Sequence, residues 1–310
     1  KVYEIKINGN GTLNNWIQTT SFNTGRFSNG GNFGSIWGGY LYISGGCTAV
    51  NGSGYCSSVA NDTQLASINA DGTIDVWNTN ASVIDQRMGQ NLITWRDNIY
   101  QIGGCSSQDS STGVCTSALQ SINQGTINQD GDASTVAQSS PSGTAPCNGA
   151  SPIGCNLPGT SYIGNMLNSS VITNGFLYVI GGCTNNGCSS TNGNVAYTAI
   201  SSTGDMTKPS TCPNGSYQGG TWCVDTVNTI SGGLAAARPV VFDNTIYLVG
   251  GLNGSSNVNA INRADLNKDG SISAWTSQSM TGLGANSISY TYAYTRANPS
   301  SASTAPGNLF

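Results

Sequence analysis

The sequence predicts an all-β protein built from repeated four-stranded antiparallel sheets. Three observations lead to this expectation. Only 8% of the 310 residues are charged, against about 25% in an ordinary soluble domain, so the helix formers Glu and Lys are scarce. Glycine is abundant, with 42 residues, as expected for a chain with many turns. Two short motifs also recur in alternation along the chain, which is the signature of a repeat protein.

The first motif is an apolar strand that ends in two glycines. In each copy a tyrosine stands three residues before the first glycine, and the residues around it are apolar or β-branched. Glycines at this position would let neighbouring strands approach closely and turn. The four copies are Tyr40–Gly46, Asn98–Gly104, Phe176–Gly182 and Thr245–Gly251.

The second motif is a hairpin with a glycine turn, followed in three of the five copies by a tryptophan. Asn-Gly and Asp-Gly between alternating apolar residues are strong hairpin signals because both residues tolerate a positive φ. The turns lie at Asn10-Gly11, Asp71-Gly72, Asp130-Gly131, Thr203-Gly204 and Asp269-Gly270, and the tryptophans are Trp16, Trp77 and Trp275. Each repeat is therefore expected to hold four strands, typified by Arg238–Asp243, a double-glycine strand, Gln64–Asn69 and Thr73–Trp77.

This order of motifs resembles that of the Kelch-repeat family, to which galactose-oxidase-like β-propellers belong. The resemblance covers nearly the whole chain and implies one β-propeller domain over residues 1–310. It implies a half-blade at 1–20, blades at 26–80, 85–137, 160–210 and 232–280, and the start of a further blade at 281–310. The third repeat departs from the pattern, because no arginine precedes its first strand and Met206 to Pro209 replace the tryptophan strand.

The two ends of the chain carry partial repeats. Lys1–Trp16 reads as the third and fourth strands of a blade, whereas 286–295 reads as a first strand and 307–310 as the start of a second. In one interpretation the two ends share a fifth blade and close the ring. In the other the chain is part of a longer protein with more blades.

Most repeated residues are expected to have structural roles. The repeat tyrosines and tryptophans should pack between blades. The recurrent arginines Arg26, Arg87 and Arg238 are expected to tie blades together.

The ten cysteines fall into five local pairs within loops rich in Gly, Ser and Asn. This arrangement favours short disulfide loops formed in an oxidising compartment. The alternative, a thiolate metal site, is disfavoured because the chain has no histidine and no Cys-x-x-Cys motif. The expected pairs are Cys47–Cys56, Cys105–Cys115, Cys147–Cys155, Cys183–Cys188 and Cys212–Cys223.

The absence of histidine excludes several kinds of chemistry. Ser-His-Asp and Cys-His catalysis, and the copper site of galactose oxidase, all need histidine. Ten scattered Lys and Arg against fourteen Asp and Glu argue against a nucleic-acid partner. We therefore expect a non-catalytic protein without a cofactor, and a glycan-active enzyme is a weaker alternative.

A binding site is expected on one face of the propeller. All ten cysteines should lie in loops on that face, either after the double-glycine strands or in the connections between blades at 136–160 and 205–235. Disulfide-stapled loops on a rigid scaffold suit binding, although the same staples could serve only to resist proteolysis. The candidate contact residues are Tyr55, Tyr162, Tyr217 and Trp222, with Asp62, Asp109 and Asp225 as further polar contacts.

Calcium is the one metal that the sequence suggests. Asp265, Asn267 and Asp269 resemble the first half of an EF-hand loop, but position twelve is Thr276 rather than Glu. A structural hairpin is the favoured interpretation of this segment.

These observations predict an extracellular or cell-surface scaffold that binds a glycan or another surface protein. The alternative is a structural subunit of an extracellular filament or surface layer, formed by self-association. No apolar run in the sequence is long enough for a membrane-spanning helix.

Overall fold

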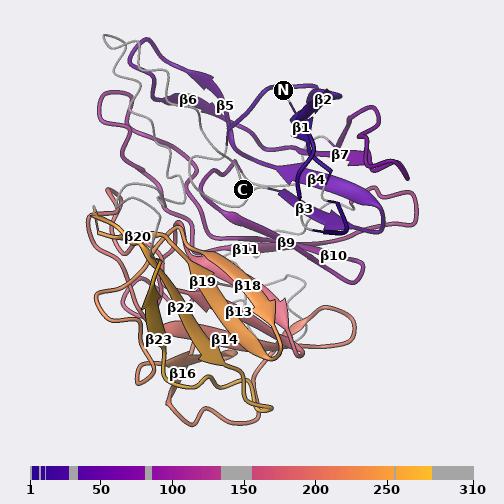
Figure 1. Cartoon of the computed structure of the whole chain (residues 1–310). Helices are drawn as coiled ribbons and strands as arrows, with labels where there is room; N and C mark the ends of the chain where they lie inside the picture. The colour runs from indigo at the N-terminus through magenta and orange to yellow at the C-terminus, as the bar shows by residue number, and fades with distance from the viewer. Residues whose placement is uncertain are drawn as a thin grey trace.

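The computed structural model describes residues 2–6, 8–10, 12–27, 34–80, 86–133, 156–254 and 256–280. Within these ranges every regular element is a β-strand, and four antiparallel sheets form the blades of a β-propeller (Figure 1). The all-β propeller predicted from the sequence is thus confirmed. No helix in the described ranges could span a membrane.

Blades 1, 2 and 4 place their strands in chain order across the sheet. Blade 1 holds β3 (Gly34–Trp37), β4 (Tyr40–Ser44), β7 (Thr63–Ser67) and β8 (Asn78–Asn80). Blade 2 holds β9 (Asn91–Trp95), β10 (Asn98–Ile102) and β11 (Ile122–Thr126). Blade 3 holds β12 (Ser169–Thr173), β13 (Phe176–Ile180), β14 (Val195–Ile200), β15 (Met206–Thr207), β17 (Trp222–Asp225) and β16 (Gly215–Gln218). In this blade β14 pairs with β17, and β16 lies outside β17. Blade 4 holds β18 (Arg238–Phe242), β19 (Thr245–Val249), β22 (Ala260–Asp265) and β23 (Thr276–Ser279).

Three two-stranded sheets accompany the blades. The loop hairpins β5 (Cys47–Val50) with β6 (Cys56–Val59), and β20 (Leu252–Asn253) with β21 (Ser256–Asn257), follow the double glycines of blades 1 and 4. At the N-terminus, β1 (Val2–Glu4) pairs antiparallel with β2 (Ile17–Thr19) in a separate two-stranded sheet. The expected strands at 286–295 and 307–310 lie outside the described residues.

The first strands of consecutive blades lie innermost and contact one another. β3 contacts β9, β9 contacts β12, and β12 contacts β18. Successive antiparallel strands are joined at alternating ends of a sheet. Turns after the first and third strands therefore open on one side, which we call the turn face. Loops after the second and fourth strands open on the other side, which we call the loop face.

The double glycines join each blade to the next. The amide of the second glycine donates to a carbonyl of the following blade, as Gly46 to Arg87, Gly104 to Asn165 and Gly182 to Leu234, each at 2.8 Å. The first glycine has a positive φ and lies against the same carbonyl. A Cβ atom on Gly103 would stand 2.1 Å from the Asn165 oxygen, so no other residue fits there.

The repeat tyrosines pack between blades, as predicted. The Tyr42 hydroxyl donates to the Gly131 carbonyl at 2.9 Å, and the Tyr100 hydroxyl donates to the Gly204 carbonyl at 2.5 Å. Each bond runs from a second strand to the glycine turn of the next blade. Apolar clusters fill the same interfaces, so the core is divided into layers between blades.

Arg26 and Arg87 bond within their own blades, which corrects the sequence expectation for these two arginines. Arg26 donates to the Gly45 carbonyl at 3.1 Å, and Arg87 donates to the Gly103 carbonyl at 3.0 Å, in each case in its own blade. Arg238 is not equivalent to them, because it is the first residue of β18, and Leu234 takes the corresponding place in blade 4. Backbone bonds from the double glycines, rather than guanidinium groups, join the blades.

The fourth strands begin later than the sequence indicated. In blade 1 only Ile74 of the expected strand 73–77 forms a bridge, to Ile68, and regular pairing begins at Asn78. The register shifts between the bridge and β8, and this bulge turns Trp77 into the core, where it is 2% exposed.

Blade 3 contains the tryptophan strand that appeared to be missing. Tyr178 pairs with Tyr197, which pairs with Cys223. In blade 1 the equivalent tyrosine, Tyr42, pairs with Leu65, which pairs with Asn78. Asn78 directly follows Trp77, and Cys223 directly follows Trp222. Trp222 therefore occupies the place of Trp77. The residues at 208–221 are an insertion between the turn and the fourth strand. The third sheet consequently runs to residue 225 rather than ending near 210.

Candidate binding face

Three disulfides lie together on the loop face. Cys47–Cys56, Cys105–Cys115 and Cys183–Cys188 each begin directly after a double glycine, and they pair as the sequence predicted. All six of these cysteines belong to one buried cluster that also contains Met88 and Met166. In blade 4 the apolar Leu252 takes the equivalent position. The loop face is therefore built around a continuous layer of sulfur and aliphatic groups.

Hydrogen bonds link the stapled loops of successive blades. The Asn51 side chain donates to the Ser110 carbonyl at 2.6 Å, and the Cys56 amide donates to the Gln108 side chain at 3.1 Å. Further along, the Cys115 amide donates to the Asn186 carbonyl at 3.3 Å. We call the loops at 47–59, 105–119, 183–192 and 252–258 the loop collar.

The Gly254 amide completes the series by donating to the Thr191 hydroxyl at 3.3 Å, which joins the loops of blades 3 and 4. Every pair of neighbouring loops in the collar is thus connected. The sequence indicated stapled loops but not these contacts between them. Gln108 and Asn186, which make them, were not among the predicted residues.

A small cavity lies within the collar between blades 2 and 3. Its volume is about 30 Å³, and its lining includes Met88, Cys105, Gln108, Cys115, Met166 and Cys188. This space suits about one water molecule. A larger ligand would have to contact the outer surface of the collar.

The Arg26–Asp62 pair is placed beside the collar by the start of blade 1. The two terminal guanidinium nitrogens of Arg26 donate to the two carboxylate oxygens of Asp62, at 2.7 and 2.9 Å. The Arg26 side chain is 1% exposed and that of Asp62 17%. Burial alone would raise the pKa of Asp62, but the hydrogen bonds and charge of Arg26 outweigh it and hold this pKa below its usual value. The opposite charges of Arg26 and Asp62 therefore cancel.

The other two predicted aspartates support loops. The Asp109 carboxylate accepts bonds from the hydroxyls and amides of Ser111 and Thr112, and the Ser111 hydroxyl contributes most to lowering the pKa of Asp109. Asp225 is 1% exposed and accepts bonds from Val227 and Asn228. Both carboxylates are occupied by their own chain segments.

Tyr55 and Tyr162 lie on the loop face and are half-buried. The Tyr55 amide donates to the Asn51 side chain at 3.0 Å, which anchors the tip of the first collar loop. Tyr162 packs against the core between blades 2 and 3, and its carbonyl accepts a bond from Asn194. Each side chain presents only part of its surface to solvent.

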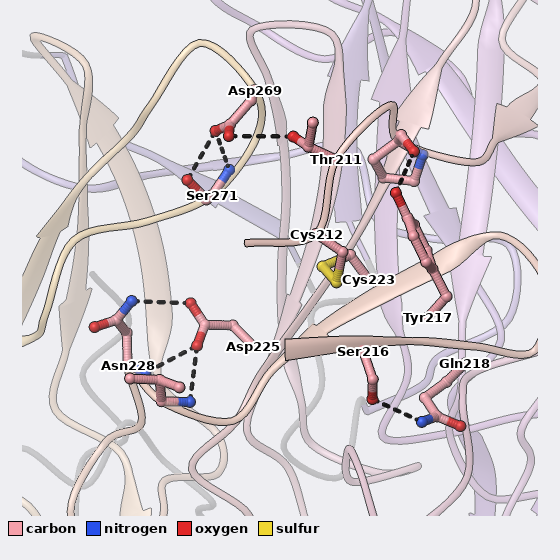
Figure 2. Close-up of a disulfide and its surroundings, with 12 residues drawn as sticks. Thr211, Cys212, Ser216, Tyr217, Gln218, Cys223, Asp225, Asn228, Asp269 and Ser271 are labelled. Atoms are coloured by element: carbon pink, nitrogen blue, oxygen red, sulfur yellow. Dashed lines mark hydrogen bonds between the residues drawn. A yellow bond between two sulfur atoms is a disulfide. The ribbon is translucent and has the colours of Figure 1, made fainter. Parts of the chain in front are cut away.

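Tyr217 lies elsewhere, on the insertion of blade 3, and Trp222 begins β17 directly after it. Trp222 has no exposed surface, so a ligand cannot reach its ring in the folded protein. The Tyr217 hydroxyl donates to the Pro209 carbonyl at 2.8 Å (Figure 2), and the ammonium group of Lys208 lies 3.8 Å from its ring centre. These aromatics hold the insertion in place.

The Cys212–Cys223 disulfide ties the same insertion to β17, because Cys212 lies in the insertion and Cys223 in the strand. Thr211, beside it, donates to Asp269 in the glycine turn of blade 4 at 3.2 Å, as Figure 2 shows. This bond places the start of the insertion next to the turn face. The expectation that all the disulfides share one face is therefore wrong, because Cys223 lies within a strand rather than in a connection between blades. Cys147 and Cys155 lie outside the described residues.

The calcium candidates serve the hairpin of blade 4. Asp269 accepts bonds from the amide and hydroxyl of Ser271, at 3.1 and 2.7 Å, and Asn267 donates to the same hydroxyl. Asp265 accepts a bond from Thr245 at 2.7 Å. In the part of the chain that the structure describes, no three His, Cys, Asp or Glu residues are grouped to hold a metal ion.

The chain matches no protein-family model and no curated protein sequence. The four disulfides of the described residues indicate folding in an oxidising compartment.

Proposed function

We propose that the protein is a non-catalytic, extracellular Kelch-type scaffold that binds a glycan or a surface protein through its loop collar. The observation that carries this proposal is the linkage of the collar loops. Three disulfides and the hydrogen bonds between neighbouring loops fix the loops of four blades as one surface. A surface that is already ordered loses little conformational entropy when it binds.

The order of double-glycine strands, glycine turns and tryptophans supports the Kelch assignment. The chain has no histidine, and the one carboxylate of the collar, that of Asp109, is bound by its own loop. These facts favour binding over catalysis.

The test uses charged variants of exposed collar serines. Ser57→Glu and Ser117→Glu place a carboxylate on collar loops of blades 1 and 2, whereas Ser202→Glu places one on the turn face. Binding to arrays of glycans and of purified surface proteins is measured for each variant. We expect the collar variants to lose more than about tenfold in affinity, or about 1.4 kcal/mol, and Ser202→Glu to bind as the wild type. Equal effects on both faces would contradict the proposal.

A structural subunit of a filament or surface layer is the second candidate. All four residues of the outermost strand of blade 4, β23 (Thr276–Ser279), are exposed, and none is charged. Exposed edge strands are commonly protected by charged residues, and uncharged ones can pair between molecules. If β23 joins copies, molecular mass in solution rises with concentration and Gln278→Lys prevents the rise. A mass that stays monomeric at every concentration rejects this candidate.

A further inference from the structure

The two faces of the propeller differ in charge. Nine of the aspartates occupy turns or strand ends of the turn face, and most are exposed. They are Asp71, Asp75, Asp97, Asp130, Asp132, Asp205, Asp243, Asp265 and Asp269. Four cations, Lys6, Arg96, Lys208 and Lys268, share that face. The turn face therefore carries a net negative charge.

The loop face has almost no charge to offer a partner. The collar loops contain one charged residue, Asp109, whose carboxylate is bound by Ser111 and Thr112. Beside the collar, Arg26 and Asp62 neutralise each other, and Arg87 is fully buried. Arg238, the first residue of β18, is a half-buried cation at the same end of blade 4. The connection at 134–155, which lies outside the described residues, has no charged residue in its sequence.

Uncharged polar side chains cover the collar instead. Exposed hydroxyl and amide groups come from the loops of all four blades, and examples are Ser57, Ser117, Ser190 and Asn257. Such groups donate and accept hydrogen bonds equally well. They match the hydroxyl groups of a sugar, which also donate and accept.

Resting on the function proposed above, we infer that the ligand of the collar is an uncharged glycan. A charged glycan would give up part of its hydration on this face without gaining a counter-charge, which is unfavourable. The negative field of the turn face adds a repulsion for polyanions. A neutral, hydroxyl-rich chain meets neither cost.

A protein partner fits the collar less well. Protein interfaces draw most of their energy from aromatic or arginine anchors that enter pockets. The cavity between blades 2 and 3 has room for about one water molecule and cannot receive such an anchor. Many shallow hydrogen bonds along a flexible polysaccharide need no pocket.

The experiment measures binding of the whole chain to immobilised polysaccharides of three charge classes: neutral dextran and xyloglucan, anionic polygalacturonate, and cationic chitosan. Salt is raised from about 20 mM to about 500 mM, which screens interactions between exposed charges. We expect binding to a neutral polysaccharide whose affinity changes less than about twofold over this range.

The variant Ser117→Lys sharpens the test. It adds a cation to the collar and should create salt-sensitive binding to polygalacturonate, whereas Ser202→Lys on the turn face should not. Wild-type binding to a charged polysaccharide that fails at high salt overturns the inference. So does a complete lack of glycan binding. If a protein ligand is then found that the collar variants block, the inference has failed and the proposed function stands.

Discussion

At the scale of single residues, the first glycine of each double-glycine motif is the most constrained position. Gly103 combines a φ of +62° with a Cβ position 2.1 Å from the Asn165 oxygen. Gly103→Ala should lower the free energy of unfolding by more than about 3 kcal/mol, because backbone of the next blade must move. Chemical denaturation measures the change.

Gly175→Ala is the matched control for this substitution. Gly175 has a φ of +79°, but a Cβ there would meet nothing within 4 Å. Gly175→Ala should therefore lower the free energy of unfolding only by the cost of backbone strain, about 1 kcal/mol. Equal losses in the two variants would show that φ, and not contact between blades, makes the double glycine necessary.

The Arg26–Asp62 pair links stability to pH. The pKa of Asp62 is lowered in the folded protein, so the unfolded chain takes up its proton first. The stabilisation is present above the unfolded pKa of about 3.9 and is lost as the pH falls through the lower folded pKa. Asp62→Asn should cost about 3 kcal/mol at neutral pH, because the buried Arg26 guanidinium loses its counter-charge.

The measurement for this pair is urea denaturation of the wild type and the variant at several pH values between about 2 and 7. The difference between the two proteins should shrink below about pH 4. Asp243→Asn, at an exposed turn, serves as the control and should leave stability almost unchanged. If the free energies of unfolding of the wild type and Asp62→Asn differ by the same amount at every pH, the ion pair is not the source of the difference.

At the scale of elements, the sequence predicted the strands that local patterns specify. The double glycines and the glycine turns encode positive φ values directly, so the second strands and the hairpins lie where expected. The fourth strand of blade 3 could not be found this way. Its tryptophan follows the turn after an insertion, and only pairing of β17 with β14 shows that Trp222 replaces the missing repeat residue.

This equivalence makes a prediction for two tryptophans in the same register position. Trp222 is fully buried between blades, whereas Trp16 in the half-blade is 54% exposed. Trp222→Ala should lower the free energy of unfolding by about 4 kcal/mol, and Trp16→Ala by less than about 1 kcal/mol. Thermal and urea denaturation of both variants measure the difference. Similar small losses would mean that Trp222 is not a core residue.

At the scale of the whole molecule, the candidate site was only partly predictable. Cysteine spacing indicated the stapled loops, because short disulfide loops are local in sequence. Aromatic residues were a poor guide to ligand contact. Trp222 is buried in the core and Tyr217 is bonded within the insertion, and no local pattern distinguishes such an anchored aromatic from an exposed one. The contacts between loops depend on blades that are distant in sequence.

The absence of histidine has a consequence for the stability of the whole propeller. The carboxylates of Asp71 and Asp269 accept hydrogen bonds from Thr73 and Ser271, which lower their pKa values, so their contribution is lost only as the pH falls below about 4. Burial raises the pKa of Tyr42 and Tyr100. Their contribution is fully present below the unfolded pKa of about 10 and is lost as the pH rises through the folded value.

Between these limits no histidine titrates, because the chain has none. We expect the midpoint of thermal unfolding to change by less than about 2 °C between pH 5 and pH 8, and to fall below about pH 4 and above about pH 10. Scanning calorimetry in buffers of matched ionic strength measures it. A fall centred near pH 6.5 would contradict the assignment of stability to carboxylates and buried phenols. A flat profile would fit a scaffold held by glycine contacts and disulfides, which carry no titrating charge.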